Sequence, residues 1–124
     1  MRFMLMLEAA DAGASDHAFD AAAGAALERY GALLLGAGVL LEAARLQSPG
    51  GGATVWLSHR RGAHVDTGPE QRGVTVQWFW LIEVRSLEEA IEWARRCKCL
   101  FTDAQQRIVI RALVEGGDAP RACT

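Results

Sequence analysis

Hydrophobic and polar positions follow two periodicities along the chain. Runs rich in apolar and β-branched residues predict strands at 2–8, 39–46, 54–60, 63–66, 74–84 and 106–115. Apolar residues three and four positions apart predict two helices, one from about His17 to Gly36 or Gly38 and one capped by Ser86. This order predicts the α+β class, as a ferredoxin-like sandwich with two helices on one face of an antiparallel sheet.

The predicted strands are apolar on both faces. In 74–84, one face carries Trp78, Trp80 and Ile82, and the other carries Phe79 and Leu81. Two helices cover only one face of a sheet, and apolar area of this size is rarely left exposed on a monomer. The pattern therefore predicts a homodimer with sheet packed against sheet, unless loops and the tail cover the second face.

Five stretches of the chain form a distinctive set: RFMLMLEA (2–9), Tyr30 followed by AGVLL (37–41), LQSP (46–49), FWLIEVRSLEEAIEWARRC (79–97) and IVIRALVE (108–115). Together they resemble the YCII-related family, in particular its DGPF-motif branch. The likeness covers residues 1–115 as one domain and leaves 116–124 as a loose tail. It implies a ferredoxin-like fold, a dimeric α/β barrel, and a pocket between sheet and helices lined by the DGPF region.

The chain departs from that motif. It reads Asp66-Thr67-Gly68-Pro69-Glu70, with a threonine inside the motif and no phenylalanine, and the family's glutamate before the LQP turn is Ala44 here. The altered motif favours a dimeric module that binds a small ligand. The alternative is a cofactor-independent, lyase-type enzyme acting on a small organic substrate.

His64 and Asp66 are the candidate catalytic residues. Two positions apart on a strand, they share a face, and a carboxylate beside an imidazole can orient the ring for proton transfer. The other interpretation is an exposed pair in which Asp66 initiates the turn before Gly68 and Pro69.

The candidate ligand-binding residues are aromatic or cationic. Trp78 and Trp80, on one strand, can form a stacking wall or belong to core and interface; the others are Tyr30 and Arg72. Arg107 can bind an anion or lie on a solvated face. The pair His17 and Asp20, at helical spacing, is a weaker candidate.

Composition narrows the classes of function. The chain has 124 residues, a net charge of -2 and 51% hydrophobic residues, which predicts one globular domain without nucleic acid as a partner. No apolar stretch reaches membrane-spanning length, and the three cysteines predict no disulfide framework, so we expect a cytoplasmic protein. Cys97 and Cys99 lack a second ligand pair for structural zinc, and we predict neither metal nor cofactor.

Overall fold

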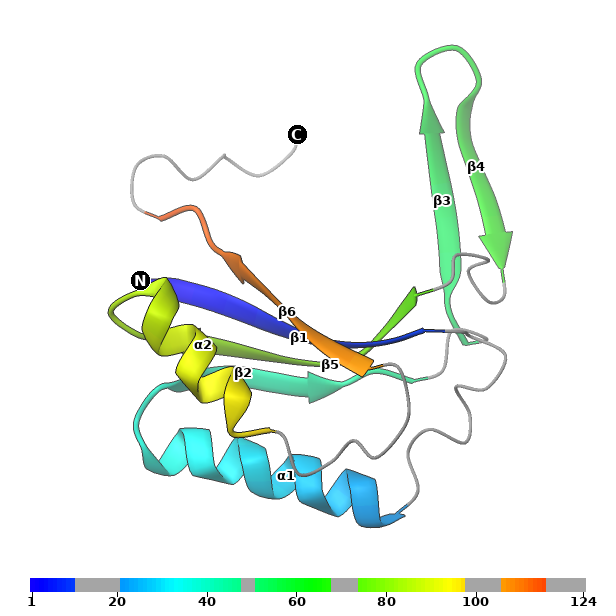
Figure 1. Cartoon of the computed structure of the whole chain (residues 1–124). Helices are drawn as coiled ribbons and strands as arrows, with labels where there is room; N and C mark the ends of the chain where they lie inside the picture. Colours follow the sequence, from blue (N-terminus) through cyan, green and yellow to red (C-terminus); the bar gives the residue numbers. More distant parts are fainter. Residues whose placement is uncertain (11–20, 48–50, 68–73, 98–105, 116–124) are drawn as a thin grey trace.

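The computed structural model describes residues 1–10, 21–47, 51–67, 74–97 and 106–115 (Figure 1). The predicted order of strands and helices is confirmed over these ranges. The elements are β1 (Arg2–Ala10), α1 (Ala21–Gly36), β2 (Leu40–Arg45), β3 (Ala53–Ser58), β4 (Gly62–Thr67), β5 (Val74–Glu83), α2 (Leu87–Arg95) and β6 (Gln106–Ala112). The predicted start of the first helix, with His17 and Asp20, lies outside the described residues, as do Arg72, Cys99 and the tail.

The main sheet has the strand order β2-β5-β1-β6, and each neighbouring pair is antiparallel. Both helices lie on the same side of this sheet (Figure 1). The predicted α+β class is confirmed, and the topology is compatible with a ferredoxin-like fold. Among the described helices, none is long and apolar enough to span a membrane.

Strands β3 and β4 form a hairpin of their own, separate from the main sheet. They pair antiparallel from Ala53↔Thr67 to Ser58↔Gly62. Gly62 has φ +73°, a conformation in which a residue without a Cβ is unstrained, and this lets the chain reverse after Arg61. The hairpin extends away from α1, on the other side of the main sheet (Figure 1).

The core lies between the main sheet and the two helices. Its buried hydrophobic residues are Phe3, Leu5, Leu7, Leu27, Tyr30, Leu34, Trp78, Trp80, Ile82, Val84, Ala90 and Cys97. In β1 and β5, alternate residues contribute to it, as the period of two predicts. The first residue of α2, Leu87, is exposed, because the inner face of this helix is formed by Ala90, Trp93 and Ala94.

Helix α2 begins with the predicted cap. The Ser86 hydroxyl accepts a hydrogen bond from the Glu89 backbone N–H at 3.1 Å. The Glu89 carboxylate in turn accepts from the Arg85 backbone N–H at 2.7 Å. Two backbone donors at the start of the helix are thereby satisfied, and the negative charge of Glu89 lies at the positive end of the helix dipole.

The face of the main sheet opposite the helices, called the open face below, has an apolar centre. Its half-buried apolar side chains are Met4, Met6, Phe79, Leu81 and Val109. Ion pairs flank this centre along the strands. Arg2 Nε lies 3.7 Å from Glu83 Oε2 at one end, and Arg107 Nε lies 3.0 Å from Glu8 Oε1 at the other.

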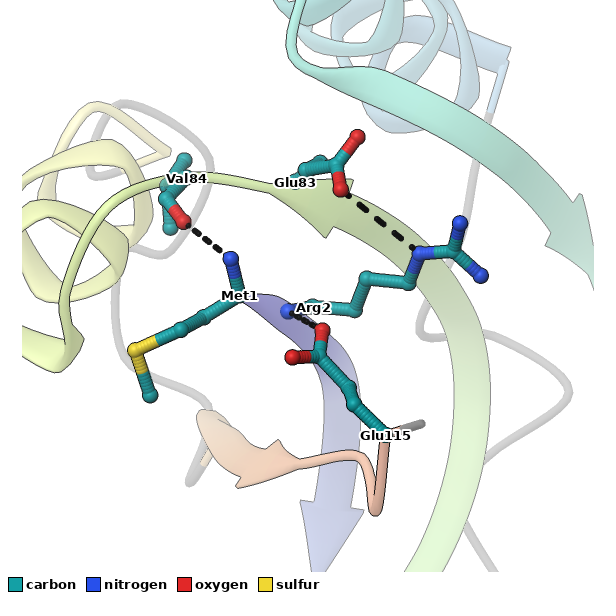
Figure 2. Close-up of polar contacts among 5 residues, drawn as sticks. All are labelled: Met1, Arg2, Glu83, Val84 and Glu115. Atoms are coloured by element: carbon teal, nitrogen blue, oxygen red, sulfur yellow. Dashed lines mark hydrogen bonds and ion pairs between the residues drawn. The ribbon is translucent and has the colours of Figure 1, made fainter. Parts of the chain in front are cut away.

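Polar contacts of the first two residues close the end of the sheet that carries the Arg2–Glu83 pair (Figure 2). The Met1 amino group donates to the Val84 carbonyl at 2.8 Å. The Arg2 backbone N–H donates to the Glu115 carboxylate at 2.7 Å, which ties the residues after β6 to the start of β1. These contacts join the start of β1 to the residues that follow β5 and β6.

A β-bulge interrupts the alternation of β5. Leu7 pairs with Trp78, but Glu8 pairs with Val76, so Gln77 is the extra residue. Simple alternation predicts that Gln77 lies on the open face together with Phe79. Instead Gln77 is 6% exposed, and its Oε1 has no hydrogen-bond partner within the described part of the chain.

Candidate functional site

A groove of about 390 Å³ lies between α1 and the edge of the main sheet. Helix α1 contributes Leu27, Glu28 and Gly31, strand β2 contributes Ala43, Ala44 and Arg45, and β5 contributes Trp78. The small side chains of Gly31, Ala43 and Ala44 leave this space open. A methyl group at Gly31 would lie 3.7 Å from Trp80 Nε1, which is an ordinary contact distance. The volume is within the range of small-molecule sites, roughly 300–1,000 Å³.

Trp78 forms the inner wall of the groove, and Trp80 supports it from the core behind. The Trp78 and Trp80 rings are stacked, with 6.0 Å between centroids and 12° between planes. The Arg45 guanidinium carbon lies 5.8 Å from the centroid of Trp78, within cation–π range. Arg45 and Glu28 are both exposed, so the mouth of the groove presents one positive and one negative side chain.

Tyr30 holds the two helices together behind this wall. Its hydroxyl donates to the Trp93 backbone carbonyl at 2.6 Å, and its ring meets Trp80 edge to face at 5.1 Å. Burial raises the pKa of the Tyr30 hydroxyl well above its ordinary value, because the phenolate would lose its hydration; the nearby Cys97 adds to this rise. Tyr30 therefore stays a neutral donor and serves the packing of α1 against α2.

The predicted ligand-binding residues thus have different positions. Trp78 lines the groove. Tyr30 and Trp80 are core residues that do not line the groove, so neither is placed to touch a bound molecule in this conformation. Arg72 lies outside the described residues.

His64 and Asp66 form the predicted pair on the hairpin. The His64 Nε2 and Asp66 Oδ1 atoms are 3.2 Å apart. The other carboxylate oxygen, Oδ2, accepts a hydrogen bond from Trp56 Nε1 at 2.9 Å. Trp56 faces His64 directly across the hairpin, so the three side chains share one face and fix the orientation of the carboxylate.

This pair is outside the groove. The side chains of His64 and Asp66 are 72% and 60% exposed, and the lining residues of the groove come from α1, β2 and β5. The expectation of a proton-transfer pair inside the pocket between sheet and helices therefore does not hold for the single chain. At this exposure, water screens the interaction between the two groups.

Arg107 and Cys97 have contacts that serve the fold. Arg107 pairs with Glu8, whose side chain is only 14% exposed, so it serves the edge of the open face. Cys97 is buried in the core at the end of α2. A further histidine of the hairpin, His59, is exposed in the turn that joins β3 to β4.

Sequence reasoning missed Arg45 and Trp56. Arg45 reaches Trp78 because the two residues are paired between β2 and β5. Trp56 reaches Asp66 because the hairpin turn spans His59–Arg61, which sets Trp56 opposite His64. Counting outward from this turn would have found Trp56, whereas the partner of β2 is not encoded in the local pattern.

Comparison with known proteins does not assign a family. No family model matches the chain, and no curated protein matches it. A function for this chain therefore has to be inferred from the groove, the open face and the exposed hairpin.

Proposed function

We propose that this chain is a divergent YCII-related protein that binds a small organic molecule in the groove between α1 and the sheet. The groove itself carries the proposal, because it combines a volume of about 390 Å³ with an apolar wall and two charges at its mouth. Apolar lining with few polar groups is typical of small-molecule sites. Ala43 and Trp78 would contact the body of the ligand, and Arg45 would face an anionic group.

The proposal includes a homodimer formed through the open face. This face has the composition of an interface, with apolar side chains at the centre and ion pairs at both ends. A two-fold axis would bring the same patch of each copy together. In the family that the sequence resembles, this arrangement is the dimeric α/β barrel.

Ala43→Phe tests the groove. The larger ring fills the space beside Trp78, and an aromatic residue is well tolerated on the exposed edge strand β2. Probes are benzoate, benzyl alcohol and benzamidine, which share a ring and differ in charge. We expect benzoate to bind most tightly to the unmodified protein, because Arg45 faces the groove, and to lose at least about tenfold in affinity with Ala43→Phe.

NMR shifts of the Trp78 indole N–H and the Ala44 amide report binding. Ala32→Phe is the matched control, since Ala32 is exposed on α1 and does not line the groove. The proposal fails if none of the probes perturbs these signals, or if Ala43→Phe binds benzoate as well as the control does.

A second candidate function is the lyase-type enzyme with His64 and Asp66 as acid and base. The 3.2 Å contact, with Trp56 orienting the carboxylate, favours it. The exposure of the pair favours the binding module, because acid–base sites gain strength where water is excluded.

Asp66→Asn separates the two candidates. For a surface pair, we expect the free energy of unfolding to fall by less than about 1 kcal/mol. Benzoate affinity in the groove should stay unchanged, with His64→Gln as a second variant. A change of tenfold or more in probe affinity would connect the pair to the ligand and favour the enzyme.

A further inference from the structure

The β3–β4 hairpin has two chemically different faces. Thr54, Trp56, His64 and Asp66 lie on one face, and the opposite face is formed by Ala53, Val55, Leu57, Ala63, Val65 and, at its edge, Thr67. On this second face, called the hairpin apolar face below, Val55 is 52% exposed, Leu57 is 84% exposed and Val65 is 56% exposed. A hairpin that served only to present His64 and Asp66 would need no second face on which every residue except Thr67 is apolar.

The single chain leaves this face without a packing partner among the described residues. Every residue of β4 is exposed, and β3 and β4 pair with each other alone within the described sheets. The hairpin points away from α1, past the main sheet on the side of the open face (Figure 1). An isolated two-stranded hairpin is marginally stable in water, so a covering surface would stabilise this one.

The area of the open face favours a second copy of this chain as the surface that covers the hairpin. Four strands about 4.8 Å apart and about 20 Å long span roughly 400 Å², about half of the ~800 Å² per partner of a standard interface. The hairpin apolar face adds roughly 160–200 Å² by the same spacings. Since the hairpin rises beside the open face, one partner can cover both surfaces. The hairpin is about 17 Å long, and two stacked sheets lie about 10 Å apart. The hairpin is therefore long enough to reach the edge of a second sheet packed on the open face.

We propose that the β3–β4 hairpin is an arm whose apolar face packs against a second copy of this chain. This inference rests on the dimer in the proposed function and adds a second contact surface to it. In a two-fold dimer, each copy extends one arm to the other, so the dimer buries two Leu57 side chains, one from each chain. The opposite face of each arm, with Trp56, His64 and Asp66, then remains accessible to solvent.

Leu57→Asn tests the arm, with Leu35→Asn as the matched control. Leu35 lies near the end of α1 and is 65% exposed, so the two variants make the same chemical change at exposed leucines. Burial of one leucine corresponds to about tenfold or more in a dissociation constant, and the symmetric dimer loses two. We expect Leu57→Asn to weaken the dimer about 100-fold in sedimentation equilibrium, and Leu35→Asn to leave it within about threefold.

The outcomes separate the arm from the dimer. A dimer unaffected by Leu57→Asn overturns the arm and leaves the open-face dimer standing, whereas an unmodified protein that is monomeric overturns both. Val65→Asn repeats the test at a second position, and thermal melting checks that each variant is folded. Hydrogen exchange of the unmodified protein at low and high concentration needs no variant: equal rates at the Leu57 and Val65 amides overturn the arm.

Discussion

Phe79→Asp is expected to convert the proposed dimer into folded monomers of 13.4 kDa. Phe79 is half-buried at the centre of the open face, on the side of β5 opposite the helix-facing core. In the dimer, the substitution would place two carboxylates in an apolar interface. Removing each ion from water costs several kcal/mol, so the dissociation constant should rise more than about 1,000-fold.

Sedimentation equilibrium measures this change, and far-UV circular dichroism checks the fold. Leu87→Asp is the matched control, because Leu87 is 47% exposed and begins α2, where a negative charge favours the helix dipole. This control should retain twice the mass of one chain. A Phe79→Asp protein with unchanged mass would contradict the open-face dimer, and a variant that unfolds would place Phe79 in the core of the single chain.

Trp80→Ala should lower the free energy of unfolding by about 3–5 kcal/mol, the largest stability effect that we expect. Trp80 is fully buried, stacks with Trp78 and meets Tyr30 edge to face. Its Nε1 has no hydrogen-bond partner among the described residues. Trp80→Phe removes that unpaired donor, which offsets part of the lost packing, so its cost should stay below about 2 kcal/mol.

Urea denaturation followed by circular dichroism compares the two variants. Trp56→Ala, at a tryptophan that is 50% exposed on the hairpin, is the control and should cost about 1 kcal/mol or less. If Trp80→Phe were as damaging as Trp80→Ala, the indole N–H would be making a contact that stabilises the fold. A cost below about 2 kcal/mol for Trp80→Ala would contradict its central place in the core.

Local pattern predicted the elements of the fold well. The alternation of Phe3, Leu5 and Leu7 placed one face of β1 in the core, and the Ser86 cap marked the start of α2. The contact between His64 and Asp66 also followed from the period of a strand. Each of these predictions depends on residues close together in the sequence, where backbone geometry alone decides the outcome.

Predictions that needed long-range register were less successful. Alternation in 54–60 and 63–66 is equally typical of a strand in the main sheet or in a separate hairpin, so the departure of β3 and β4 from the main sheet was not predicted. The groove depends on Gly31 of α1 lying over Ala43 and Trp78. Those residues come from three elements, and their proximity is set by the packing of the helix on the sheet.

The extra residue at Gln77 has a consequence for how the protein can change in evolution. An additional residue bends a strand and increases its twist, and this one lies near the start of β5, shortly after the hairpin in the sequence. Deleting one residue here would restore simple alternation between β1 and β5 and straighten β5. The number of residues in β5, rather than their chemistry, therefore sets the local twist of the sheet at this point.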